Sequence, residues 1–293
     1  MSRRKGIKKR KGRKRLAYGV IAVAFILLCF LAYSSLHSSP PKAAIVDHLS
    51  FFSEQSNQTF VDACITILKS GGLTWKYYKG EEVTVDFYRN LPSYGTSLII
   101  LRVHSAIMKT PEGIVSVLGL FTSEVYSPEA AQKYPEDVED NRLVKAFFTE
   151  GGEEYFGIVP KFVEKSMKGE FENTIIIMMG CDGLGYINTL TRVPYTDMAE
   201  AFRKRGAKVY IGWDGPVGVN HTDQATLDLL QSLIEKQTIK EAVEEVDADP
   251  NYKSELKFYP GGAGSYAIPN LRSSLIMNVA CTSPTPKAPR SPN

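Results

Sequence analysis

The sequence has little of the chemistry that binds metals or builds disulfides. Its 293 residues include only four cysteines and four histidines. No two cysteines have the CxxC spacing, and no histidines and cysteines cluster at the spacing of metal ligands, so neither a zinc site nor another bound cofactor is expected. Gly180, Gly183 and Gly185 follow the spacing GxxGxG, which differs from the phosphate-binding GxGxxG pattern.

Acidic residues are missing from the first 15 residues, which hold ten of the 35 lysines and arginines. The rest of the chain therefore has 25 basic residues against 32 acidic ones, a net charge of about −7. Because the basic run is confined to the N-terminus of a mildly acidic chain, it favours a topology signal and contact with lipid headgroups over nucleic-acid binding.

Charged residues are also missing from Leu16 to Leu36, a run of 21 residues. At about 1.5 Å per residue, a helix of this length spans the roughly 30 Å hydrocarbon core of a bilayer. The positive charges at residues 1–15 predict a cytoplasmic N-terminus and a single transmembrane anchor, with the body of the chain outside the cell membrane. Small residues around Ser34 and Ser35 leave open a cleaved signal peptide, although its apolar region is usually shorter.

After a short linker at residues 37–42, strand-like and helix-like segments alternate. Strands are expected at residues 43–46, 73–78, 97–103, 113–121, 174–179 and 208–213, and helices at residues 60–68, 160–167, 197–205, 225–234 and 239–246. Continuous apolar strands separated by helices predict an α/β fold, a three-layer sandwich of a mostly parallel sheet with helices on both faces. One domain, residues 43–280, is expected before a disordered Pro-rich tail at residues 281–293.

Four predicted strands end in residues that can do chemistry. The strand ends carry Asp47, His104 with Ser105, Cys181 with Asp182, and Trp213 with Asp214. In an open α/β sheet, sites gather at the carboxyl ends of the parallel strands, so these side chains are expected along one edge. A cysteine and a histidine placed together suit nucleophilic catalysis, in which the thiolate attacks a carbonyl and the imidazole moves the proton.

Each of these residues also has a structural interpretation. Cys181, at the end of an apolar strand, could fill the core, and His104 could simply bond to backbone. Asp47 could belong to a turn, Trp213 could be a core residue, and the two later aspartates could be solvated. Cys64 lies on the inward face of a predicted helix and is interpreted as a core residue.

The order of these motifs resembles that of the caspase-like cysteine peptidases, a group that includes caspases, legumain, clostripain, gingipains and separase. The stretch SLIILRVHSA at residues 97–106 resembles their histidine strand, and TIIIMMGCDGL at residues 174–184 resembles their cysteine strand. Residues 197–246 are similar to the stretch after the nucleophile in gingipain-like and CHAT-type members. The resemblance covers about residues 43–246 and implies a caspase-like sheet and a peptidase activity.

Carried over position by position, the resemblance implies that Cys181 is the nucleophile and His104 the general acid and base. The amide of Ser105 would contribute to the oxyanion hole, with that of Cys181 as a second donor. The family usually has glycine after the histidine, whereas this chain has Ser105. A serine fits there only if the backbone dihedrals suit a non-glycine residue, which leaves room for an altered or lost activity.

The resemblance also implies where a substrate is recognised. In the family the P1 side chain lies between the end of the first strand and the strands near the nucleophile. Asp47 stands at the first of these places, and Asp182, Trp213 and Asp214 stand near the second, so a basic P1 residue is expected.

The leading expectation from the sequence is thus a membrane-anchored cysteine endopeptidase that faces outward and acts on peptides or proteins. A transpeptidase that uses the same acyl-enzyme is a close variant. The alternatives are a catalytically inactive caspase-like module that binds a peptide or cell-envelope partner, and a substrate-binding protein with an apolar pocket.

Overall fold

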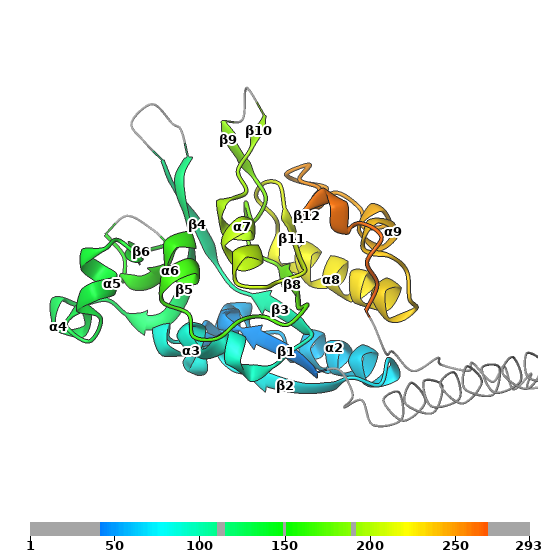
Figure 1. Cartoon of the computed structure of the whole chain (residues 1–293), viewed down its shortest axis with the longest axis horizontal. Helices are drawn as coiled ribbons and strands as arrows, with labels where there is room; N and C mark the ends of the chain where they lie inside the picture. Colours follow the sequence, from blue (N-terminus) through cyan, green and yellow to red (C-terminus); the bar gives the residue numbers. More distant parts are fainter. Residues whose placement is uncertain (1–41, 110–114, 149–150, 189–191, 269–293) are drawn as a thin grey trace, which may run out of the picture. The chain divides into compact units, whose positions relative to one another are not determined.

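Six strands form the central sheet of the protein, whose computed structural model describes residues 42–109, 115–148, 151–188 and 192–268 (Figure 1). In sheet order these strands are β12 (Leu256–Tyr259), β11 (Val209–Trp213), β8 (Ile175–Met178), β3 (Leu98–Arg102), β1 (Lys42–Asp47) and β2 (Thr74–Tyr78). All neighbouring pairs are parallel except β11 and β12, which are antiparallel. The sheet is thus mostly parallel, as the continuous apolar strands predict.

A second, antiparallel sheet begins directly after β3. Its order is β4 (Ser105–Lys109), β5 (Val115–Val125), β7 (Tyr155–Ile158) and β6 (Leu143–Ala146). The short pair β9 (Tyr186–Asn188) and β10 (Val193–Pro194) follows β8. The sequence predicts one extra strand or hairpin at residues 113–121, whereas the observed sheet also contains β6 and β7. These two strands have four residues each, too few to give a clear alternating pattern in the sequence.

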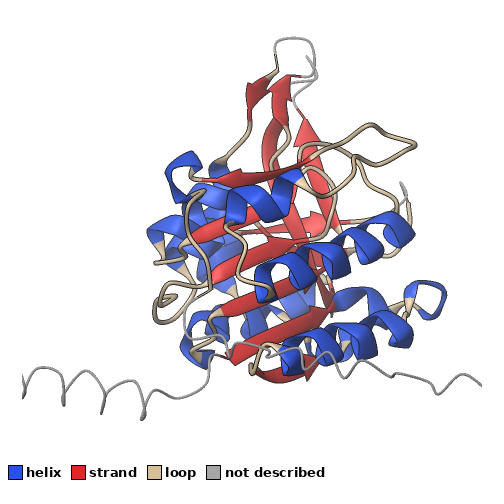
Figure 2. Cartoon of the chain, turned by 90° about the vertical axis from the view of Figure 1, so that its right-hand side faces the viewer, coloured by secondary structure: helices blue, strands red, loops and turns tan. Residues whose placement is uncertain are grey.

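Helices cover both faces of the central sheet (Figure 2). On one face lie α2 (Gln58–Ser70), α8 (Val219–Ile234) and α9 (Ile239–Glu244). On the other lie α3 (Val85–Asn90), α6 (Pro160–Lys165) and α7 (Asp197–Lys204), together with β5 and β7. The remaining short helices are α4 (Pro128–Ala131) and α5 (Pro135–Glu139).

Alternation along the strands explains why both faces are covered. In β1, Ala44 and Val46 pack into the core under α3, whereas Ala43 and Ile45 pack into the core under α2. Every residue of β3, β8 and β11 is buried, so these strands expose neither face to water. The mixed α/β fold with helices on both faces is therefore confirmed, and the predicted strands of this sheet occur at the expected positions.

Two differences concern the later part of the chain. The helix expected at residues 225–234 begins at Val219, because Gly218 starts it and donates its backbone N–H to Asp249 Oδ2 at 3.0 Å. Strand β12 was not predicted, because only Leu256 in it is buried and its pattern is weak. Strand β12 forms one edge of the central sheet beside β11, whereas the added turn of α8 reaches β3, where Asp223 bonds Arg102.

The predicted cytoplasmic segment at residues 1–15, the transmembrane helix at residues 16–36 and the tail at residues 281–293 lie outside the described residues, as does nearly all of the linker at residues 37–42. Within the described part of the chain, no helix is both long and apolar enough to cross a membrane.

Candidate active site

His104 stands just past the end of β3, where a fully buried strand reaches the edge of the central sheet. The side chain is half-buried, and its Nε2 lies 2.6 Å from Oε1 of Gln55. Because a carboxamide oxygen only accepts hydrogen bonds, Nε2 carries the proton and Nδ1 is left as the acceptor. The contact therefore fixes both the orientation and the tautomer of the imidazole.

Gln55 is a site residue that the sequence did not reveal. It ends the short helix η2 (Ser53–Gln55), in the segment that leads from β1 to α2. Its backbone carbonyl also accepts a hydrogen bond from Nη2 of Arg102 at 2.9 Å, which ties this segment to β3. The only signal in the sequence was its place shortly after a strand that ends at the same sheet edge.

Cys181 follows β8, which lies beside β3 in the sheet. Its thiol is free and half-buried, and Sγ lies 3.8 Å from the backbone carbonyl of Val217. The preceding Gly180 is closely covered: a Cβ there would lie 2.6 Å from both the Val103 carbonyl oxygen and Ser105 Oγ. Glycine at this position therefore lets the loop that bears Cys181 approach the loop that bears His104.

Ser105 joins these two loops directly. Its hydroxyl donates a hydrogen bond to the backbone carbonyl of Cys181 at 2.6 Å. Its φ is not positive, so the serine side chain fits the backbone here without strain.

The amide of Ser105 has a defined direction. The residue before it, His104, accepts a hydrogen bond from the Phe121 N–H at 3.0 Å. Because bonding alternates along an antiparallel pair, the next N–H, that of Ser105, points away from β5. This direction is compatible with the expected part of Ser105 in an oxyanion hole.

Replacing Ser105 by alanine is expected to lower the free energy of unfolding by about 1 kcal/mol, because the Cys181 carbonyl loses a hydrogen bond in a part-buried site. Urea unfolding of the full chain measures the change. Ser93→Ala is the matched control, since its hydroxyl bonds the Asn90 carbonyl at the same distance, 2.6 Å, but at an exposed site. Equal losses in the two variants would contradict a special role for the link between the loops.

A buried ion cluster lies beneath the site. Arg102, fully buried at the end of β3, bonds Oδ1 of Asp47 through Nη1 at 2.8 Å, and it bonds both oxygens of Asp223 at 2.7 and 2.9 Å. Tyr77 and the Ser50 backbone also donate to Asp47, at 3.1 and 3.2 Å. Burial raises the pKa of Asp47, and the Arg102 guanidinium opposes this shift.

Asp47 was expected to contact a substrate, but the structure places its carboxylate inside this cluster, with no exposed surface. Its oxygens accept from protein donors, so the expected salt bridge to a basic P1 side chain gains no support from this residue.

The residues at the end of β11 are also engaged with the protein. Trp213 is buried, and its indole N–H donates to Thr222 Oγ1 at 2.9 Å. Asp214 is buried as well and accepts from the Tyr186 hydroxyl at 3.0 Å and from the Glu255 backbone N–H at 2.7 Å. Trp213 thus belongs to the core, in agreement with its structural interpretation. Asp214 anchors the turn after β11.

Asp182 lies next to Cys181 in a left-handed conformation with φ of 58°. Its backbone N–H donates to the Gly215 carbonyl at 2.9 Å, which binds the loop after β8 to the loop after β11. The charge of its carboxylate contributes to the raised pKa of the Cys181 thiol, because a nearby negative charge disfavours the thiolate. Of the predicted substrate-binding residues, Asp182 is the one that remains half-buried, and it adjoins Cys181 in the chain.

The electrostatics of the pair favour neutral side chains. Burial is the main cause that raises the pKa of the Cys181 thiol, and the charge of Asp182 adds to it. Burial also lowers the pKa of His104 to about 4, with a smaller contribution from the Arg102 guanidinium. Near neutral pH the resting site therefore holds a thiol and an uncharged imidazole, and no thiolate–imidazolium pair is preformed.

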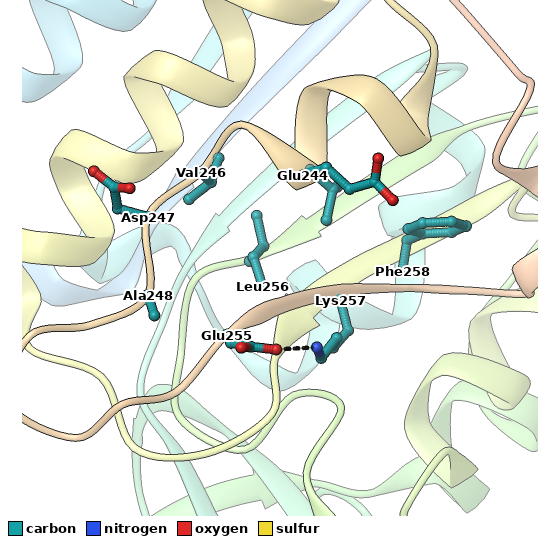
Figure 3. A pocket seen from close by; sticks show the side chains of 9 residues that line it. Glu244, Val246, Asp247, Ala248, Glu255, Leu256, Lys257 and Phe258 are labelled. Atoms are coloured by element: carbon teal, nitrogen blue, oxygen red, sulfur yellow. Dashed lines mark hydrogen bonds and ion pairs between the residues drawn. The ribbon is translucent and has the colours of Figure 1, made fainter.

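A pocket of about 450 Å³ lies apart from these residues, between α9 with the segment that follows it and strand β12 (Figure 3). It is lined by acids and by apolar side chains, and Glu255 there pairs with Lys257. None of the residues expected in the active site lines it. Within the described residues, no group of three or more histidines, cysteines and acids could hold a metal ion.

The geometry thus joins His104, Ser105 and Cys181 at neighbouring strand ends and adds Gln55 behind the imidazole. It places Asp47, Trp213 and Asp214 in internal contacts. Comparison with protein-family models finds no match for this chain, and comparison with curated protein sequences finds none either.

Proposed function

We propose that the protein is a cysteine peptidase of the caspase-like type, in which Cys181 is the nucleophile and His104 the general acid and base. The observation that carries the proposal is the link between the two loops, in which the residue after His104 hydrogen-bonds the backbone of Cys181 across adjacent strands. The orientation of His104 by Gln55 adds to it, because a base held by a third group is typical of nucleophilic sites.

The reaction would begin from the neutral pair. As Sγ of Cys181 attacks the carbonyl carbon of a peptide bond, Nδ1 of His104 takes the thiol proton. The resulting oxyanion would be stabilised by the backbone N–H groups of Ser105 and Cys181. Gln55 holds the Nε2 proton, so that Nδ1 is the nitrogen free to accept.

In the second half of the reaction, His104 returns the proton to the amine that leaves, and the acyl group stays on Cys181 as a thioester. Water, activated by the same imidazole, then releases the acid and restores the thiol. An amine in place of water would give a transpeptidase by the same route. No cofactor is needed for either outcome.

The site would face the outside of the cell. The apolar run at residues 16–36, preceded by ten basic residues, fits a single membrane anchor with a cytoplasmic N-terminus. Peptides or proteins outside the membrane would then be the substrates, and nucleic acid has no part in this function.

The second candidate is an inactive module of the same type that binds a peptide or cell-envelope partner. The neutral pair favours it, because burial shifts the pKa of Cys181 upward and that of His104 downward, and both shifts oppose thiolate formation. The two candidates differ in whether the thiol reacts with help from the imidazole.

Covalent labelling of the full chain with a peptide chloromethyl ketone distinguishes these candidates. We expect Cys181 to react, and we expect labelling at this position to disappear in Cys181→Ala. In His104→Ala the labelling rate should fall by roughly 100-fold or more, because a general base contributes about 10²–10⁴-fold. Mass spectrometry of digested protein identifies the modified cysteine.

Two variants serve as controls. Cys64→Ala should keep full labelling, because Cys64 is buried in the core and burial raises its pKa strongly. His221→Ala removes a half-buried histidine of α8 and should also keep it. Labelling of Cys181 at an unchanged rate in His104→Ala would exclude the proposed pair and leave the inactive module.

A further inference from the structure

A cluster of aromatic rings surrounds the imidazole of His104. The ring centroid of Phe148 lies 4.6 Å from that of His104, in an edge-to-face contact. The rings of Phe52 and Phe121 each lie 6.0 Å from it. We call Phe52, Phe121 and Phe148 the aromatic cluster; they come from the segment after β1, from β5 and from the segment after β6.

The three rings also contact one another. Phe148 is stacked on Phe121 at 4.8 Å with an interplanar angle of 27°. It meets Phe52 edge-to-face at 4.9 Å. Such separations lie within the range that aromatic pairs favour, so the rings form a preformed apolar wall beside the imidazole.

This wall is partly open to solvent. Phe148 is 44% exposed, Phe52 is half-buried, and Phe121 is buried beneath them. An exposed aromatic ring beside a candidate catalytic histidine leaves apolar surface in water that a ligand side chain can cover. The proposed role of His104 points to a substrate as this ligand. A substrate whose leaving amine is protonated by His104 must lie against the imidazole, and therefore close to these rings.

The buried guanidinium near the cluster is already paired. Arg102, behind His104, is bonded to Asp47 and Asp223. Glu54 and Glu153, near Phe52 and Phe148 along the chain, are exposed, and they accept hydrogen bonds from the hydroxyls of Ser53 and Tyr155, which carry no counter-charge. The rings of the aromatic cluster are in contact with His104, so the surface beside the imidazole suits an apolar side chain better than a cationic one.

We propose that the aromatic cluster is a substrate subsite that binds a large apolar side chain, preferentially an aromatic one, at a residue that flanks the scissile bond. This inference rests on the proposed peptidase function and specifies its substrate class. It replaces the basic preference that the strand-end acids suggested, since Asp47 and Asp214 are committed to internal contacts.

Binding of short peptides to the full-length Cys181→Ala variant in detergent tests the subsite without turnover. The peptides are acetylated and amidated alanine hexamers with one fluorescent label and one central guest residue: phenylalanine, leucine, arginine, aspartate or alanine. We expect the phenylalanine peptide to bind about 10-fold more tightly than the arginine or alanine peptide, with leucine between them, which is the effect of covering one ring.

Variants at two neighbouring positions locate the effect. Phe148→Ala in the same background should reduce binding of the phenylalanine peptide to the level of the alanine peptide. Phe147→Ala is the matched control, because Phe147 is 47% exposed but lines a separate hollow with Ile107 and Val144 on the antiparallel sheet. It should leave the preference for phenylalanine unchanged.

Three results overturn the proposal: equal or tighter binding of the arginine peptide, no binding of any peptide, or an unchanged preference in Phe148→Ala. These results are independent of the labelling test. A phenylalanine preference without His104-dependent labelling of Cys181 would leave a peptide-binding site and remove the peptidase, whereas labelling without that preference would keep the peptidase and remove this subsite.

Discussion

Arg102→Leu is expected to lower the free energy of unfolding by about 3–5 kcal/mol, because it leaves the carboxylates of Asp47 and Asp223 buried without a counter-charge. Both acids have almost no contact with water, and leucine cannot replace the hydrogen bonds of the guanidinium. Urea unfolding of the full chain at pH 7 measures the loss. The same variant removes the bond from Nη2 to the Gln55 carbonyl, so it should also slow His104-dependent labelling of Cys181.

Arg203→Leu is the matched control for the charge and the volume of the substitution. Arg203 pairs with Glu200 at 3.7 Å on the exposed side of α7, and an exposed pair contributes about 0–1 kcal/mol. A second variant, Arg102→Lys, keeps the charge but cannot bond two carboxylates and a carbonyl at once, so it should lie between the other two. A loss below about 1 kcal/mol in Arg102→Leu would contradict a fully desolvated cluster.

The central sheet was predictable because its strands are apolar on both faces. Ile175–Met178 and Val209–Trp213 read as buried strands in the sequence, and they are buried strands in the structure. The rule that parallel strands present their carboxyl ends at one edge then brought His104 and Cys181 into the same region. This part succeeded because it depends on local composition and on a general property of sheets.

The partners of the strand-end residues were not predictable, because they come from distant parts of the chain. Asp47 looked available to a substrate, yet its partner Arg102 is 55 residues away, and Arg102 meets Asp223 across 121 residues. A lone acid at a strand end has the same appearance in the sequence whether it is paired or exposed. Asp47 has a structural role because the whole ion cluster is buried, and this burial depends on how distant parts of the chain fold together.

Gln55 and Phe148 escaped prediction for a related reason. Neither belongs to a spacing motif, and both lie outside regular strands in segments that the sheet brings to His104. A glutamine and a phenylalanine in such segments carry no spacing signal that points to a site. Their importance follows from contact with the imidazole, which is a property of three dimensions.

Acid conditions are expected to destabilise the protein through two histidines that are held neutral. Burial lowers the pKa of His48 to about 3 and that of His104 to about 4, from an ordinary value of 6.5. Within the described residues, neither ring nitrogen of His48 has a well-formed hydrogen bond, and its ring packs among Phe52, His104 and Phe121. Protonation would therefore place an unpaired charge in an apolar environment.

The direction of the effect follows from proton uptake. Between pH 6.5 and about 4 the unfolded chain binds protons on both histidines and the folded chain binds few, so stability is complete above pH 6.5 and falls as the pH is lowered. Each histidine contributes at most about 1.4 kcal/mol per pH unit in this window. Asp47 acts in the opposite direction, because its raised pKa favours proton uptake by the folded chain, so variants are needed to isolate the histidines.

His48→Phe should flatten the dependence of unfolding free energy on pH by up to about 1.4 kcal/mol per unit between pH 6.5 and 4, because phenylalanine keeps the ring contacts and cannot titrate. Urea titrations at pH 7, 6, 5 and 4 give the slopes. If His48→Phe loses stability with acid as steeply as the parent, then His48 is not held neutral in the folded chain, and the acid sensitivity of the site rests on His104 alone.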